Sequence, residues 1–169
     1  MFSRTRFLHL LTAISLTWIV LMTHAVGKAM AQPLDDVAFR NLATVRAGFD
    51  AWSAGTGSPY DSLADHARWE IVGNSVASRV YVDKEDFLTN VIRPFNARMS
   101  QRLVPTIRDI FADRDTVIVL FDAAGVARDG IPYRNTYAWF LTLEGDQIVR
   151  ASAFFDAIAF NDLWQRVPV

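Results

Sequence analysis

Residues 130–156 read GIPYRNTYAWFLTLEGDQIVRASAFFD, and large apolar side chains alternate there with polar ones. This period of two is typical of β-strands. Similar patterning runs back to Leu103, so the expected strands are 103–112, 116–127, 132–143 and 147–155. Turn-forming residues separate them: Asp113-Arg114-Asp115, Asp129-Gly130 and Glu144-Gly145-Asp146. The C-terminal half is therefore predicted to be a meander of antiparallel strands, followed by a short helix over 157–166.

Helical patterns precede these strands. Asp35 and Asp36 can cap a helix, which the glycine-rich stretch 54–58 would end. Its apolar residues recur at near-helical spacing: Val37, Leu42, Val45, Phe49 and Trp52. A second, short helix is expected from Ser58-Pro59 to about His66, because serine caps helices and proline favours their first position.

The segment between the helices and the meander mixes both patterns. A strand is expected over 67–72 and a strand fragment over 80–82. Asp83 then caps a third helix, which Pro94 should bend or end after Arg93. Helices followed by a meander of strands indicate an α+β fold, with the helices packed on one face of a curved sheet.

The N-terminus has the pattern of a secretory signal peptide. Arg4 and Arg6 precede an apolar run over 7–22, which is 16 residues long (22 − 7 + 1). That run is shorter than the roughly 20 residues that span a bilayer, and Ala29-Met30-Ala31 supplies small residues for cleavage after Ala31. The expected domains are a cleavable signal peptide, 1–31, and one exported domain, 32–169. An uncleaved membrane anchor is the alternative, and a periplasmic or secreted location follows in either case.

Composition excludes several classes of function. The chain has no cysteine, so disulfides and cysteine-ligated metals are excluded. Its 17 basic and 18 acidic residues become 14 and 18 once Arg4, Arg6 and Lys28 leave with the signal peptide, a net charge of −4. This balance argues against nucleic acid as a partner. His66 would be the single histidine left, so no multi-histidine metal site is expected, and no nucleotide motif predicts an organic cofactor.

Several segments resemble SnoaL-like domains of the nuclear transport factor 2-like superfamily. The strongest are residues 130–139, 143–149 and 154–156; residues 67–73 and 81–87 resemble the family's first strand and the following helix entry. The resemblance covers about residues 40–165. Its motifs are loose, so it identifies a fold better than a reaction.

The resemblance implies a cone: a strongly curved antiparallel sheet packed around N-terminal helices, with a deep apolar pocket and often a homodimer. Family members include isomerases, polyketide cyclases and dehydratases that use no organic cofactor, as well as binding modules without chemistry. The expected lining of such a pocket is Trp52, Trp69, Tyr81, Phe95, Asn135, Tyr137, Trp139 and Phe154. The alternative is that most of these aromatic residues are ordinary core.

Asp156 is the candidate catalytic residue. It ends the last expected strand after Phe154-Phe155, at the position of the carboxylate that ends this strand in SnoaL-like cyclases. A carboxylate among aromatic rings is harder to ionise, which suits proton transfer near neutral pH. Asp156 is equally well placed to cap the helix that begins at Ala157. Both roles stay open at this point.

Other family residue sets are missing. The positions of the steroid-isomerase base, tyrosine and second carboxylate are occupied by Ile71, by Gly48 or Phe49, and by Ala138. The epoxide-hydrolase Arg–Asp pair would fall near Thr116 and Ile118. Reactions that depend on those sets are therefore not expected.

A few polar residues remain as candidates. Asn135 and Tyr137 share one strand face and Arg134 lies on the other, and we favour the Asn135/Tyr137 face for the pocket. Asp122 is expected to face solvent or a bulge, because an unpaired buried carboxylate is costly. A surface or capping role is expected for His66.

Two functions follow from these patterns. The first is a cofactor-independent acid–base enzyme, of isomerase, cyclase or dehydratase type, acting on a small apolar substrate with Asp156 as the proton-transfer group. The second is a non-catalytic protein of the cell envelope that binds a small molecule or a partner. A homodimer is expected in both cases, with no membrane partner after signal cleavage.

Overall fold

A computed structural model describes residues 36–169 of the chain. The predicted signal peptide and the predicted cap at Asp35 lie outside this range. The described part begins with a helix over residues 36–54. The elements that follow are β1 (Leu63–Ile71), β2 (Val80–Tyr81), α2 (Lys84–Phe87), η2 (Leu88–Ile92), α3 (Arg93–Ala97), β3 (Met99–Asp113), β4 (Thr116–Ala127), β5 (Pro132–Glu144), β6 (Gln147–Phe155) and α4 (Ala157–Arg166).

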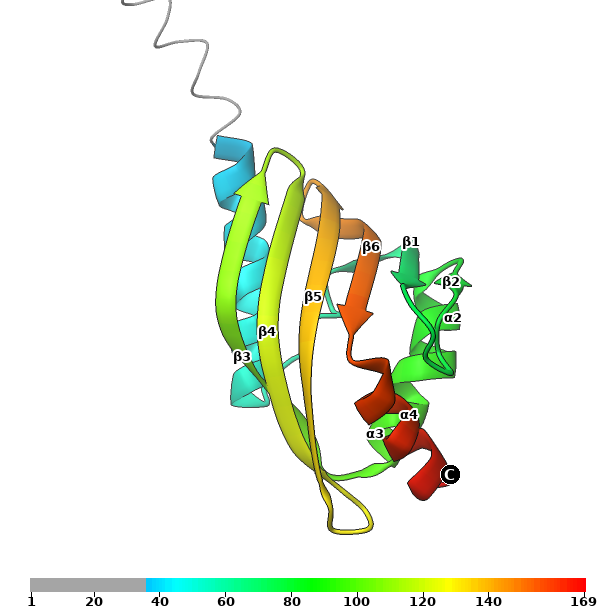
Figure 1. The fold of residues 1–169 in the computed structure, drawn as a ribbon. Coiled ribbons are helices and arrows are strands. Elements are labelled where there is room, and N and C mark those ends of the chain that lie inside the picture. The colour runs from blue at the N-terminus through cyan, green and yellow to red at the C-terminus, as the bar shows by residue number, and fades with distance from the viewer. Residues whose placement is uncertain (1–35) are drawn as a thin grey trace, which may run out of the picture. The chain divides into compact units, whose positions relative to one another are not determined.

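The strands form one six-stranded sheet in the order β2-β1-β6-β5-β4-β3 (Figure 1). Strands β3 to β6 are the predicted meander, so the α+β class and the four predicted strands are confirmed. The sheet is mixed, however, because β1 pairs with β6 in parallel. The antiparallel expectation therefore fails at this single strand pair, where β1 enters beside the last strand of the meander.

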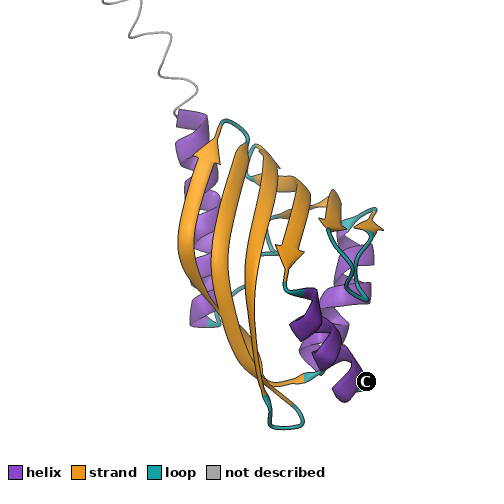
Figure 2. Cartoon of the chain, viewed as in Figure 1, coloured by secondary structure: helices purple, strands orange, loops and turns teal. Residues whose placement is uncertain are grey.

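The N-terminal helix lies along β3 and β4 (Figure 2) and packs against the sheet through its predicted apolar stripe. Val45 and Phe49 are buried, and the Phe49 ring meets the Phe121 ring of β4 edge-on at 4.9 Å. The helix ends at Gly55, whose φ of 75° suits glycine. The guanidinium of Arg102 from β3 donates to the last carbonyls of the helix, so this terminus is held by the sheet.

The predicted second helix, from Ser58-Pro59 to His66, is wrong. The Ser58 hydroxyl does accept from the Tyr60 amide, but this local capping serves only a turn. Strand β1 already begins at Leu63 and buries Ala67, Trp69 and other residues on its inner side. Pairing of β1 with β2 and β6 satisfies its backbone, which overrides the local helix signal.

The predicted third helix is confirmed at its start, where Asp83 accepts from the Asp86 amide. It does not end after Arg93. Residues Leu88–Ile92 form a π-helical segment, and α3 continues from Arg93 through Pro94 to Ala97. A proline cannot donate the ordinary helix hydrogen bond, so the wider π turn carries the chain past it.

The meander strands have two chemically different faces. The inner face, toward the helices, carries the buried residues of the alternation, as in β5 from Tyr133 to Leu143. The outer face carries exposed or half-buried residues such as Phe140 and Arg134. These two faces hold the two candidate sites described next.

Candidate functional site

The inner face encloses a small aromatic cavity of about 50 Å³. Its walls come from the N-terminal helix, β1, the α2–α3 region, β5, β6 and α4. The lining residues are Trp52, Tyr60, Trp69, Ile71, Phe87, Val91, Ile92, Phe95, Leu103, Tyr137, Trp139, Ala153, Phe155 and Phe160. No carboxylate, imidazole or amine belongs to this lining.

Trp139 lies at the centre of this aromatic cluster. Its ring contacts six other aromatic rings, including Trp52, stacked at 6.2 Å, and Trp69, edge-on at 5.1 Å. Such dense ring packing explains why the cavity is small, since the side chains expected to line a deep pocket largely fill it. Trp139 and the rings packed around it are therefore part of the core, whether or not they also contact a ligand.

A polar network runs along the inner face of β5. The Asn135 amide donates to the Tyr133 hydroxyl at 2.9 Å, and that hydroxyl is hydrogen-bonded to the Tyr137 hydroxyl at 3.0 Å. Burial raises the pKa of Tyr137 well above its usual value, and the neighbouring Tyr133 raises it further. Burial also raises the pKa of Tyr133. These phenols are neutral at ordinary pH and act as hydrogen-bonding groups.

Two further polar groups of the cavity lining are Tyr60 and Trp69. Trp69 is 2% exposed, and its Nε1–H has no hydrogen-bond partner in the described part of the chain. Burial raises the pKa of Tyr60 strongly. The cavity lining thus offers neutral donors in an otherwise apolar surface.

Asp156 is not part of this cavity. It is exposed and caps α4, accepting from the Ile158 amide at 2.8 Å. Its backbone amide and carbonyl are held by the Asn135 side chain, at 2.9 and 3.0 Å. The expected position among aromatic rings is therefore wrong, because the helix cap turns the carboxylate outward, while its capping role is confirmed.

Asp156 instead lines an open groove of about 510 Å³, which involves mainly outer-face residues of β3, β4 and β5. The groove is lined by Val104, Thr106, Asp122, Ala123, Ala124, Arg134, Asn135, Thr136 and Asp156. Asp122 accepts from the Thr136 hydroxyl at 2.6 Å and lies 3.7 Å from Arg108. Asp122 is exposed, as predicted, and so is His66.

Two of the aromatic residues expected in the pocket, Phe154 and Tyr81, lie outside the cavity lining. Phe154 is 43% exposed on the outer face, where it meets Phe140. A bulge at Val149 shifts the alternation along β6, so that Phe155 rather than Phe154 points to the cavity. Tyr81 is buried but outside the cavity lining, and its hydroxyl donates to the Ala77 carbonyl at 2.6 Å.

The other expected lining residues, Trp52, Trp69, Phe95, Tyr137 and Trp139, do meet in the cavity. Asn135 lies on the same face of β5 as Tyr137 and Trp139, but it lines the outer groove and not the cavity. Sequence reasoning missed several lining residues, among them Tyr60 before β1, Phe87 and Ile92 in the α2–η2 region, Phe155 at the end of β6 and Phe160 in α4. The outward rotation of Phe154 by the β6 bulge left no signal in the sequence.

Neither a metal-binding cluster nor a membrane-spanning helix is found among the described residues. Across residues 36–169, no group of three or more metal-ligating side chains comes together. Within the same range, no helix has the length and apolar character that crossing a membrane requires.

A bent mixed sheet around a helix, with an aromatic interior, defines the class of cone-shaped α+β pocket proteins. The sequence model of the SnoaL-like domain matches residues 45–151, and the chain belongs to this family. The resemblance inferred from the sequence is therefore confirmed. A search of curated proteins gives no match.

Solved structures agree with this assignment. Bal32a, from a soil-derived mobile gene cassette, is similar at a TM-score of 0.62 with 18% identity, over 75% of this chain and 98% of its own. A candidate SnoaL-like polyketide cyclase from Jannaschia sp. CCS1 is similar at a TM-score of 0.61 with 17% identity, over 78% of this chain and 96% of its own. A candidate isomerase from Bacillus subtilis is similar at a TM-score of 0.58 with 18% identity, over 75% of this chain and 93% of its own. At these identities the likeness concerns the fold.

Proposed function

We propose that this protein binds a small, uncharged, apolar molecule in its aromatic cavity. The observation that carries the proposal is the chemistry of the cavity lining. It consists of aromatic and aliphatic side chains with a few neutral donors, and it contains no carboxylate, imidazole or amine. Apolar walls with few polar groups are typical of small-molecule sites.

The polar groups of the cavity favour binding over acid–base catalysis. Burial raises the pKa values of Tyr60 and Tyr137, so neither phenol is a proton acceptor near neutral pH. The Trp69 indole N–H can only donate. A ligand with one hydrogen-bond acceptor on an apolar body fits this arrangement best.

The cavity must widen for a ligand to enter. Its volume of about 50 Å³ is below the roughly 150 Å³ of an engineered apolar cavity that binds benzene. Trp52, Tyr60, Ile92 and Phe155 line the cavity and are only partly buried, so these are the side chains that we expect to move outward. Binding is therefore expected to be accompanied by rotation of these side chains.

The first test is native mass spectrometry of the purified protein, followed by denaturation of the same sample. A bound molecule appears as excess mass that is lost on denaturation, and its identity gives the ligand class.

A second test is titration with benzene, followed by tryptophan fluorescence. Ala153→Leu fills the cavity and should abolish the response, whereas Ala138→Leu on the neighbouring strand's outer face should leave it unchanged. A benzene response that survives Ala153→Leu would contradict the proposal.

Acid–base catalysis in the outer groove is a second candidate. Its support is the presence of Asp156, Asp122 and Arg134 around one groove of a size usual for ligand sites. Asp156→Asn is a sharp test, because asparagine also caps helices and should preserve α4. Unsaturated ketones and polyketide-like compounds are the substrates to screen. Turnover that Asp156→Asn removes without loss of ligand affinity would favour the enzyme over the binder.

We also propose export and a homodimer. The signal-peptide pattern of residues 1–31 supports a periplasmic or secreted location, and the denatured mass of the exported protein tests cleavage after Ala31. Exposed apolar residues on the outer face, among them Phe111, Phe140 and Phe154, support pairing of two sheets. Sedimentation analysis should give a dimer that Phe140→Asp dissociates. A monomeric wild-type protein would contradict this part of the proposal.

A further inference from the structure

Arg98 is a buried charge outside both candidate sites. It follows α3 and is 6% exposed. Its guanidinium stacks on the Trp164 ring of α4 at 3.9 Å, and one NH group donates to the Pro94 carbonyl at 2.9 Å. Its Nε–H has no partner in the described residues. A buried charge of this kind calls for a counter-charge.

The charged groups around Arg98 do not supply that counter-charge. Among residues 36–169, the ion pairs include neither Arg98 nor Arg128. Arg128 is adjacent, since its backbone amide donates to the Arg98 carbonyl at 2.8 Å. Burial lowers the pKa of Arg98, and the charge of Arg128 lowers it further. Both arginines are nevertheless cationic at neutral pH.

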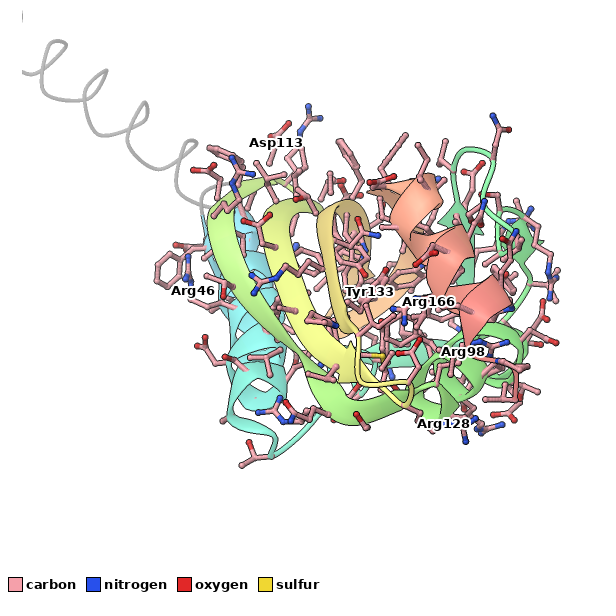
Figure 3. All side chains as sticks on the ribbon, turned by 60° about the horizontal axis from the view of Figure 1, so that its bottom comes forward. Arg46, Arg98, Asp113, Arg128, Tyr133 and Arg166 are labelled. Carbon is pink, nitrogen blue, oxygen red and sulfur yellow. The ribbon has the colours of Figure 1, made fainter. Side chains whose placement is uncertain are left out.

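Nearby acids are already engaged. Asp129 follows Arg128 in the β4–β5 turn and pairs with Arg166, which also binds Asp162 at 2.8 Å. Figure 3 shows Arg98, Arg128 and Arg166 gathered at one end of the molecule, near α4. Arg166 is thus neutralised by two carboxylates, while Arg98 and Arg128 keep their positive charges.

We propose that Arg98 and Arg128 form a binding site for an oxyanion, the carboxylate or phosphate group of a small molecule. Guanidinium groups present planar pairs of N–H donors that match both kinds of oxyanion. Stacking on Trp164 fixes the plane of Arg98. Arg128 is exposed to solvent, and its guanidinium makes a single hydrogen bond among the described residues, to the Pro168 carbonyl at 2.9 Å, which leaves other N–H groups for an anion. The site is separate from the aromatic cavity and from the outer groove, whose linings include neither arginine.

The test is an NMR titration of the arginine side-chain Nε–H signals. Inorganic phosphate and acetate are added in separate titrations, each with a chloride control of equal ionic strength. A saturable shift of the Arg98 Nε–H signal in the millimolar range is expected with at least one of them. Preference for phosphate or for acetate identifies the kind of oxyanion, and either preference supports the site. A shift that chloride reproduces would overturn it.

Variants make the test specific. Arg128→Gln removes an exposed guanidinium and should weaken binding about tenfold, because one charge-assisted contact is lost. Arg46→Gln is the matched control, since Arg46 is exposed on the N-terminal helix and lies on the opposite side in Figure 3. Arg98→Lys keeps the charge but loses the planar donor pair, and should weaken binding as well. Unchanged oxyanion affinity in Arg128→Gln would refute the proposal, whatever the folding of Arg98→Lys.

Discussion

The two faces of the meander use the same strands for different chemistry. On β5, Tyr137 and Trp139 are buried in the aromatic cluster, whereas Thr136 and Phe140, their neighbours in sequence, face outward. The inner face has rings and neutral donors but no carboxylate in its cavity, and the outer groove has Asp122 and Asp156. The aromatic cavity and the carboxylates of the groove are therefore separated by the thickness of one sheet.

This separation bears directly on function. The aromatic cavity has no carboxylate in its lining, and the cap of α4 holds Asp156 outside it. From family membership alone, we would have expected the aromatic rings and the carboxylate to lie in one cavity. The following predictions test how different the two faces are.

The largest effect is expected at high pH. The chain has four tyrosines, at 60, 81, 133 and 137, and burial is the main cause that raises the pKa of each. A folded-state pKa above the unfolded value near 10 means that the stabilisation is complete below about pH 10 and is lost as the pH rises through the folded pKa values. The folded protein should therefore show little tyrosinate absorbance near pH 10 and unfold cooperatively above it.

Ultraviolet absorbance and circular dichroism, recorded in parallel, check this expectation. Protein unfolded in urea is the control and should titrate near pH 10. Gradual tyrosinate formation near pH 10 with the circular dichroism spectrum intact would show that the inner face is wetter than the structure indicates.

The next effect contrasts adjacent residues of β5. Trp139→Ala removes the ring at the centre of the aromatic cluster and should lower the free energy of unfolding by about 4 kcal/mol. Phe140→Ala, at a residue 40% exposed on the outer face, should cost about 1 kcal/mol. Urea unfolding at two protein concentrations measures both and separates folding from dimer dissociation. Equal losses would contradict the distinction between the faces.

The sequence predicts the meander well because its signals are local. Alternation and turn residues define four strands to within a few residues, and Asp83 and Asp156 are recognisable caps. The error over 58–66 has a different cause. There, a local capping motif competes with pairing to β6, a strand more than eighty residues away, and the distant partner wins.

The site is less predictable than the fold. Alternation along β5 correctly places Asn135 and Tyr137 on the inner side. On β6 the same reasoning fails, since one bulged residue, Val149, reverses which of Phe154 and Phe155 faces the cavity. The volume of the cavity depends on ring packing between distant segments, which no sequence pattern expresses.

A smaller effect is expected at Asn135. Its side chain holds both backbone polar groups of Asp156 and also donates to Tyr133. Asn135→Ala leaves these partly buried backbone groups and the Tyr133 hydroxyl without this partner and should cost about 2 kcal/mol. The control is Thr136→Ala, which loses one exposed hydrogen bond to Asp122 and should change stability by less than about 0.5 kcal/mol.

Thermal and urea unfolding of both variants provide the measurement. An NMR spectrum of the Asn135→Ala variant should also show changes at the start of α4, because Asp156 caps that helix. If Asn135→Ala were as stable as Thr136→Ala, the inner network would have no structural role and Asn135 would be free for ligand contact.

The smallest effect on stability, and the sharpest separation of stability from function, is expected at Asp122. Its partner Arg108 is 3.7 Å away and both side chains are about half exposed. Exposed pairs of this kind contribute little, so Asp122→Asn should change the free energy of unfolding by less than about 0.5 kcal/mol. Asparagine can still accept from the Thr136 hydroxyl, which preserves the local geometry. Ligand binding or turnover that falls in this stable variant would locate function in the outer groove, whereas unchanged binding alongside its loss in Ala153→Leu would locate it in the aromatic cavity.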